Sequence, residues 1–290
     1  MDHKQLRWVY LLALALIWGS SFILMKRALI GMTPIQLGAL RILISAVLLL
    51  LIGFRRVSLI KRRHWPYLVV NALIGTFFPA FLFAYALDKM DSAIAAILNS
   101  LTPLQTLIFG ALFFGFGFRK RQLLGVLIGL AGTVLLIVKG AELHPNQDYF
   151  YALLIVIASV GYAINVNILK KYLHDLDALS ITVGNFLVLI LPVLAVLYLA
   201  DFSATFVWDK AGMNALFYVS ILAILGTGVA KLMFNRLVQL SSPVFSSSVT
   251  YLIPLVAVFW GLLDGETVTF SQFSYGLLIL LGVYMANKSR

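Results

Sequence analysis

The chain has 290 residues, of which 62% are hydrophobic and 11% are charged, and its mean hydropathy is +1.00. About a quarter of the residues of a typical soluble domain are charged, so this composition excludes a soluble protein and indicates an integral membrane protein. The sequence contains no Cys, which excludes disulfides, thiolate nucleophiles and thiolate metal ligands. The net charge of +11 comes with no basic patch interleaved with aromatic residues, so we expect no nucleic-acid partner.

Apolar runs that are long enough to cross a hydrocarbon core about 30 Å thick follow one another along the whole chain. We therefore expect an all-α integral membrane bundle of ten transmembrane helices. The expected spans lie at residues 7–30, 34–54, 66–87, 92–115, 122–138, 150–170, 179–199, 212–236, 243–263 and 271–287. The first run is longer than the apolar part of a secretory signal and no cleavage site follows it, so we expect it to remain as the first span.

The first expected span is interrupted near its middle by small residues, Gly19, Ser20 and Ser21, which follow Trp18. Small residues let a neighbouring helix approach closely, and freed backbone carbonyls can face a water-filled cavity. We expect substrate contacts at Trp18, Ser20 and Ser21, and a break or hinge in the helix at Gly19.

Four cations lie at membrane depth, where an ionisable residue is by default a functional hypothesis. Lys26 and Arg27 lie near the end of the first span, and snorkelling to the interface explains them. Arg41 lies close to the middle of the second span, and Lys231 lies in the eighth span. Ligand contact is one interpretation of both; the alternatives are anchoring by backbone carbonyls for Arg41 and snorkelling for Lys231. No Asp or Glu lies at this depth.

Polar residues recur at helical spacing in three further spans, which predicts polar faces on these helices. The candidates for a substrate cavity are Asn99 and Thr102 in the fourth span, Tyr162 and Asn165 in the sixth, and Thr250 and Tyr251 in the ninth. The alternative role for such residues is to join helices to one another.

Three prolines mark positions at which a helix is expected to be weakened: Pro79, Pro103 and Pro254. We interpret them as hinges for movement between parts of the bundle. Kinks of purely structural use are the alternative.

Most Lys and Arg residues outside the spans fall in alternate links, and most acidic residues fall in the remaining links. Basic links such as Arg55 to Arg63 and Arg119 to Arg121 are typical of the cytoplasmic side of a membrane. The distribution predicts that both termini are cytoplasmic in a multi-pass protein of a bacterial inner membrane.

The sequence resembles itself at an offset of 151 residues. "IGT" at residues 74–76 matches "LGT" at 225–227, and the same offset pairs Pro103 with Pro254 and Gly125 with Gly276. We expect a first five-helix repeat at residues 1–140, a connecting loop at 141–149 and a second repeat at 150–290. An odd number of spans in each repeat makes the repeats inverted, which is typical of transporters with a binding site between the halves. Duplicated halves also occur in membrane proteins that carry nothing.

The segment "IWGSSFILMKRALIGMTPIQLGALRILISAVLLLLI" (17–52) resembles the opening of the EamA-type drug/metabolite transporters, which have a Trp-Gly-Ser-Ser-Phe element and later a Pro and an Arg. The ends of both halves are also similar to that family. The resemblance implies a ten-helix carrier of small metabolites. Such carriers often transport amino acids and commonly move their substrates out of the cell. One departure concerns the family's Gly-Glu pair after the fourth span of each half, because only the second half has it, as Gly265-Glu266.

The charges at membrane depth bear on the substrate. A proton-coupled exporter of cationic drugs needs a buried carboxylate, whereas buried Lys or Arg favours a substrate with a carboxylate or phosphate. We therefore expect alternating-access transport, by export, of amino acids or other carboxylate-bearing metabolites. The alternatives are a drug or cationic-compound efflux carrier, a non-transporting membrane protein and an intramembrane enzyme.

Beyond the substrate and the lipid bilayer, the sequence indicates few further components. All four His lie in links or tails, and neither paired acids within the spans nor a zinc-protease motif is present. We expect no catalytic residue, no metal and no cofactor. The sequence is compatible with a monomer and with a homodimer.

Overall fold

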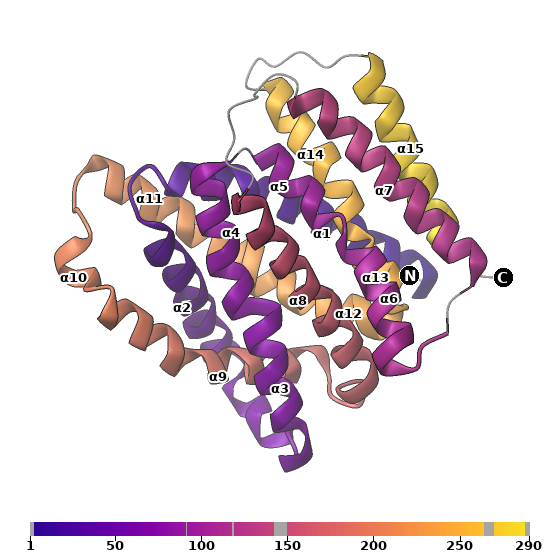
Figure 1. Cartoon of the computed structure of the whole chain (residues 1–290). Coiled ribbons are helices and arrows are strands. Elements are labelled where there is room, and N and C mark those ends of the chain that lie inside the picture. The colour runs from indigo at the N-terminus through magenta and orange to yellow at the C-terminus, as the bar shows by residue number, and fades with distance from the viewer. Residues whose placement is uncertain (1–2, 91, 118, 142–149, 264–269, 288–290) are drawn as a thin grey trace.

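The computed structural model describes residues 3–90, 92–117, 119–141, 150–263 and 270–287, and all regular structure in these ranges is helical (Figure 1). The first half contains α1 (His3–Ala28), α2 (Pro34–Gly53), η1 (Phe54–Leu59), η2 (Arg62–His64), α3 (Trp65–Ala72), η3 (Leu73–Phe77), α4 (Phe78–Lys89), α5 (Ser92–Asn99), α6 (Thr102–Phe114) and α7 (Lys120–Ala141). The second half contains α8 (Phe150–Tyr172), α9 (Ala178–Leu199), α10 (Phe202–Thr205), α11 (Lys210–Ile221), η4 (Leu222–Val229), α12 (Ala230–Leu240), α13 (Pro243–Ser247), α14 (Val249–Leu263) and α15 (Phe270–Asn287).

Each of the ten segments expected to span a membrane is helical. Six helical stretches of the described chain are long and apolar enough to cross a membrane, and shorter apolar helices occur at Thr102–Phe114, Pro243–Ala257 and Phe273–Ala286. The chain is therefore an all-helical, multi-pass membrane protein. Ten crossings and the orientation of the termini stay predictions. Residues 142–149 of the expected link and the Gly265-Glu266 pair lie outside the described residues.

Short polar caps begin several of these helices. Before α2, the Thr33 hydroxyl accepts a hydrogen bond from the Gln36 backbone N–H at 3.3 Å, and the Gln36 side chain accepts one from the Thr33 N–H at 2.9 Å. This reciprocal pair satisfies two N–H groups that the helix itself leaves free. Asp177 and Asp209 cap the starts of α9 and α11. Their carboxylates accept hydrogen bonds from the backbone N–H groups of Ser180 and Gly212, respectively.

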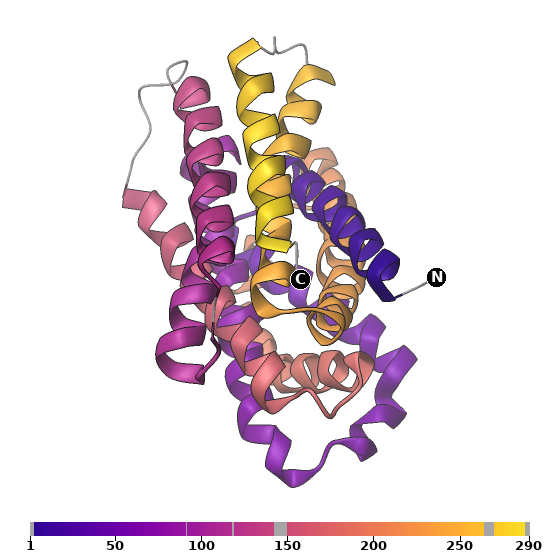
Figure 2. The same cartoon turned by 90° about the vertical axis from the view of Figure 1, so that its right-hand side faces the viewer.

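The two halves of the chain pack against each other throughout the bundle. Helix α1 contacts α14, α2 contacts α9, and α4 and α6 both contact α8. At one edge α7 and α15 form a closely packed pair (Figures 1 and 2). Their approach requires glycine, because a Cβ added at Gly125 would lie 2.5 Å from the Ala286 nitrogen.

Two π-helices interrupt the long helical stretches, and they occupy corresponding places in the two halves. Gly75 in η3 and Gly226 in η4 are separated by the same offset of 151 residues that relates the repeated sequence motifs. Each π-helix packs against the first helix of the other half, η3 on α8 and η4 on α1. A Cβ added at Gly75 would overlap the Asn165 side chain, and one at Gly226 would lie 2.6 Å from the Ser21 hydroxyl oxygen. Such segments shift the backbone hydrogen-bond register and are frequent at functional sites.

Candidate functional site: a cationic cavity between the halves

A cavity of about 110 Å³ lies between the two halves, which is room for several water molecules. Its walls come from α1, α2, η3, α4, α5 and α6 of the first half and from α8, η4, α12, α13 and α14 of the second. Nine of the eleven residues expected to contact a substrate line this cavity: Trp18, Ser21, Arg41, Asn99, Thr102, Tyr162, Asn165, Lys231 and Thr250. Their role in binding stays a prediction, but the structure brings them together.

Arg41 reaches the cavity from α2. Its Nε donates a hydrogen bond to the Thr227 hydroxyl oxygen at 3.1 Å, and its Nη1 lies 3.5 Å from the Met25 sulfur. These weak acceptors leave much of the donor capacity of a guanidinium, which has five N–H groups, available to another partner. Within the described residues no carboxylate pairs with Arg41.

Lys231 lies on α12 and is 7% exposed. Its ammonium donates a hydrogen bond to the Gly75 carbonyl oxygen in η3 at 2.8 Å. Lys231 therefore belongs to the cavity wall and does not snorkel to the interface, whereas contact with a ligand stays a prediction. The bond joins the second half of the chain to the π-helix of the first half.

Trp18 makes the corresponding connection in the other direction. Its indole N–H donates to the Gly226 carbonyl oxygen in η4 at 2.9 Å, and its ring packs against Phe234. Helix α1 continues without interruption through this segment, so the expected break at Gly19 is wrong. The backbone irregularity lies in the π-helices of other spans. Gly19 instead permits close packing, because a Cβ there would lie 2.5 Å from Val256 on α14.

The polar faces of the fourth and ninth expected spans meet at the cavity. The Ser100 hydroxyl donates to the Thr250 carbonyl oxygen at 3.0 Å, which joins the break between α5 and α6 to α14. Thr102 donates to the Asn99 carbonyl oxygen at 2.6 Å, and the Thr250 hydroxyl donates to the Ser247 carbonyl oxygen at 3.0 Å. Thr102 and Thr250 therefore line the cavity and also bond to carbonyls of the preceding helical turn.

Tyr162 and Asn165 line the cavity from α8. The Tyr162 ring packs against Phe83 of the first half. The Asn165 side chain donates to the Asn71 carbonyl oxygen at 3.1 Å, so it also joins α8 to α3. For Asn165, the two roles weighed from the sequence, a cavity residue and a link between helices, coexist.

Two of the expected site residues lie elsewhere. Ser20 accepts a hydrogen bond at 2.8 Å from the Trp260 indole N–H on α14 and does not line the cavity. The Tyr251 side chain is fully buried, and its hydroxyl donates to the Val126 carbonyl oxygen on α7 at 3.1 Å. Adjacent residues of a helix differ by about 100° in direction, which turns Ser20 away from Ser21, and Tyr251 away from Thr250.

The three prolines differ in their positions. Pro103 lies in the first turn of α6, after the break that follows α5, where a missing N–H is tolerated. Pro79 is the second residue of α4, which continues the helical backbone of η3. Pro254 lies inside α14, which continues through it. Pro79 follows η3 directly and Pro103 follows the break between α5 and α6, so both stand beside an irregular segment. Movement at these hinges stays a prediction.

Sequence reasoning missed several cavity residues, of which Thr76, Thr227 and Met25 are close to the cations or the π-helices. Thr76 and Thr227 belong to the repeated "IGT" and "LGT" motifs, so the repeat already contained the signal that would have found them. Met25 and the aromatic lining residues carry no comparable signal in an apolar helix.

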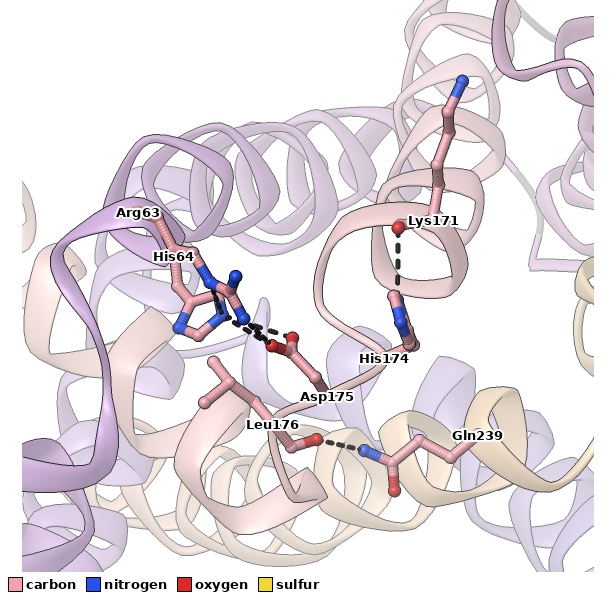
Figure 3. Close-up of polar contacts among 7 residues, drawn as sticks. All are labelled: Arg63, His64, Lys171, His174, Asp175, Leu176 and Gln239. Atoms are coloured by element: carbon pink, nitrogen blue, oxygen red, sulfur yellow. Dashed lines mark hydrogen bonds and ion pairs between the residues drawn. The ribbon is translucent and has the colours of Figure 1, made fainter.

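A second cluster of polar side chains lies where the link between α2 and α3 meets the link between α8 and α9 (Figure 3). Asp175 pairs with Arg63 and accepts a hydrogen bond from His64 Nε2 at 3.2 Å. Gln239 Nε2 on α12 donates to the Leu176 carbonyl oxygen at 2.7 Å, so α12 is also joined to the link between α8 and α9. Partial desolvation of Asp175 acts to raise its pKa, but the hydrogen bonds from His64 and Arg63 outweigh it and lower the pKa below the ordinary value.

The fold and the cavity define a class of protein. A chain of membrane-length helices, with two interlocked halves and a polar cavity between them, has the architecture of a carrier. The family model of EamA-like transporters matches residues 6–138 and again residues 149–288. The chain belongs to the EamA-like transporter family, as the sequence resemblance indicated.

Individual relatives are similar over nearly the whole chain. An uncharacterized transporter of Bacillus subtilis, YvbV, is 25% identical over 94% of this chain and 89% of its own length. The uncharacterized inner membrane transporter YedA of Escherichia coli is 28% identical over 89% of this chain and 83% of its own. A third relative from Escherichia coli, named "Probable amino-acid metabolite efflux pump", is 24% identical over 96% and 93%.

A solved crystal structure superposes with a TM-score of 0.71 over 96% of this chain and 95% of that chain, at 19% identity, which shows a common fold. The family and the names of the relatives point to a membrane transporter rather than an enzyme.

Proposed function

We propose that this protein transports small carboxylate-bearing metabolites, amino acids among them, by alternating access through the cavity between its halves. The transport is export across a bacterial inner membrane, with two inverted five-helix repeats, ten spans and both termini in the cytoplasm. The observation that carries the proposal is the pair of cations in the cavity wall, Arg41 and Lys231, which no carboxylate of the described chain neutralises.

The charges of the cavity favour an anionic group on the substrate. A cation at membrane depth is costly unless it is paired or well hydrogen-bonded. Here the partners of the two cations are a hydroxyl, a thioether and one backbone carbonyl, so an incoming carboxylate provides a much stronger acceptor. A cationic compound would meet like charge and no acid among the described lining residues. This weighs against efflux of cationic drugs.

The arrangement of the halves supports alternating access. Both π-helices carry a carbonyl bound by a side chain of the other half, Gly75 by Lys231 and Gly226 by Trp18. Bonds of this kind hold the halves together around the cavity, and they can be exchanged when a substrate enters. One relative is named as an efflux pump for amino-acid metabolites, which supports both the substrate class and the direction.

The test is uptake and counterflow in proteoliposomes with labelled amino acids, organic anions and cationic dyes. Wild type is compared with Arg41→Ala and Lys231→Ala, and with Lys210→Ala and Arg236→Ala, whose exposed cations lie outside the cavity. Loss of a charge-assisted hydrogen bond costs about 1.5–3 kcal/mol, so we expect the cavity variants to lose roughly 10–100-fold in kcat/KM for carboxylates. The exposed variants should transport like wild type.

Folding of each variant is checked by monodispersity and melting temperature in detergent. Arg41→Lys and Lys231→Arg retain the charge and should retain more activity than the alanine variants. Transport of cationic dyes with both alanine variants active would overturn the anionic-substrate proposal. Inactivity of all four alanine variants would trace the loss to folding or insertion and would contradict the specific role of the cavity cations.

A further inference from the structure

The Lys231 ammonium is incompletely satisfied in a buried position. It has three N–H donors, and in the described part of the chain the Gly75 carbonyl oxygen is its hydrogen-bond partner. The side chain is 7% exposed, and the atoms around it belong to the cavity wall. An ammonium that reaches the cavity with donors to spare is suited to bind an anion there.

The next residue after Gly75 is a second unsatisfied donor. Thr76 is 7% exposed and lines the same cavity, and its hydroxyl is buried without a hydrogen-bond partner among the described residues. Threonines inside regular helices commonly donate to the carbonyl four residues earlier, as Thr106 and Thr133 do here. Thr76 lies within the π-helix η3 and has no such bond.

The corresponding threonine of the other half is occupied. Thr227 in η4 accepts the hydrogen bond from Arg41 Nε at 3.1 Å. The two π-helices therefore differ: the threonine of η4 supports a cation of the cavity, whereas the threonine of η3 has a buried hydroxyl with no hydrogen-bond partner among the described residues, next in sequence to a carbonyl that already binds a cation. This asymmetry distinguishes the η3 side of the cavity from the η4 side.

We propose that Thr76 and Lys231 form an anion subsite on η3, in which a carboxylate of the transported molecule replaces the Gly75 carbonyl as the partner of the Lys231 ammonium. This subsite rests on the proposed function and specifies where the anionic group binds. The Thr76 hydroxyl donates the second hydrogen bond to the carboxylate. Because the bond between Lys231 and Gly75 joins the two halves, its exchange removes one connection between them when the substrate binds.

The absence of Cys from the sequence allows a test that needs no knowledge of the substrate. Thr76→Cys places a single thiol in the subsite, and Ser247→Cys places one on another wall of the cavity. Each variant is treated with two thiosulfonate reagents that differ in charge, one carrying a sulfonate and the other a trimethylammonium group. The two reagents differ in intrinsic reactivity toward a thiolate, so each rate is divided by the rate of the same reagent with Ser247→Cys. We expect this relative rate at Thr76→Cys to be about tenfold higher for the anionic reagent, because Lys231 attracts it.

Removing the cation gives the decisive comparison. In Thr76→Cys combined with Lys231→Gln, the anionic preference should fall to near unity, whereas combination with the exposed Lys210→Gln should leave it unchanged. A thiol at this position that reacts with neither reagent, reacts equally with both, or retains its preference without Lys231 would overturn the proposed subsite.

Transport measurements on Thr76 variants distinguish a failure of the proposed subsite from a failure of the proposed function. Thr76→Val removes the hydroxyl at nearly constant volume and Thr76→Ser retains it, so carboxylate transport should fall about tenfold in the first and persist in the second. Thr133→Val is the matched control, since that buried hydroxyl lies outside the cavity. If wild type transports carboxylates and Thr76→Val does so equally well, the subsite is wrong and the function stands. If wild type carries no carboxylate, the proposed function itself fails.

Discussion

At the scale of single residues, hydrogen bonds between the halves explain why particular residue types are required at the cavity. Trp18 illustrates this, because its ring could be replaced by another apolar residue, whereas its N–H finds the Gly226 carbonyl oxygen in the opposite half at 2.9 Å. A buried carbonyl that loses its donor costs about 1–3 kcal/mol. The identity of this residue therefore bears on both stability and the movement of the π-helix.

We expect Trp18→Phe to lower the melting temperature and to reduce transport about tenfold, because the variant keeps the aromatic packing and loses only the donor to η4. Trp260→Phe is the matched control, since its indole N–H bonds to Ser20 away from the cavity. Melting in detergent and initial rates in proteoliposomes check both variants. Equal transport by the two variants would show that the bond to Gly226 has no part in the transport cycle.

At the scale of helices, run length and composition predicted where helical segments lie, and each expected span is helical. Local irregularities were not predictable in the same way. A π-helix rotates all following residues relative to a regular helix, and hydropathy does not report that rotation. Thr76 lies within such a segment, and the signal that pointed to it was the repeated motif and not the hydropathy. A helical period also does not state which of two adjacent polar residues faces a cavity. Ser21 and Thr250 line the cavity, whereas their neighbours Ser20 and Tyr251 do not.

The link between α8 and α9 is held to η2 by the Asp175 carboxylate, and this contact should depend on pH (Figure 3). The carboxyl pKa is lowered in the folded protein, so the contact stabilises the fold above the ordinary carboxyl pKa of 3.8, and this stabilisation is lost as the pH falls through the lowered value. At neutral pH we expect Asp175→Asn to lower the melting temperature by about 1–3 °C, since a partly exposed ion pair contributes little.

The difference between Asp175→Asn and wild type should shrink as the pH is lowered below 3.8, because wild type then loses the same charge. Asp201→Asn is the control, because Asp201 is exposed and, among the described residues, its carboxylate accepts a local hydrogen bond from Ser203. Melting curves recorded in detergent between acidic and neutral pH make the comparison. A pH-independent difference would indicate that packing of the link, and not the charge of Asp175, determines its stability.

At the scale of the whole molecule, the sequence indicated two related halves, and the structure adds how the halves hold each other. Lys231 of the second half bonds to η3 of the first, whereas Trp18 and Arg41 of the first half bond to η4 of the second. A repeat detected by sequence contains no information about such exchanged contacts, because they arise only after the halves interlock. These three contacts lie at the cavity itself, where a substrate can act on them.

The charges of the links predict the orientation of the whole molecule in the membrane, and this prediction can be tested directly. The link that contains Ser58 is rich in Arg and Lys, whereas the link that contains Ser203 carries acidic residues, so the two should lie on opposite sides of the membrane. Both serines are exposed and the chain has no Cys, so Ser58→Cys and Ser203→Cys each introduce a single accessible thiol. In intact cells a membrane-impermeant thiol reagent should label only Ser203→Cys, and permeabilised cells should label both. Labelling of Ser58→Cys from outside would reverse the predicted topology, and with it the direction in which the cavity must open to export its substrate.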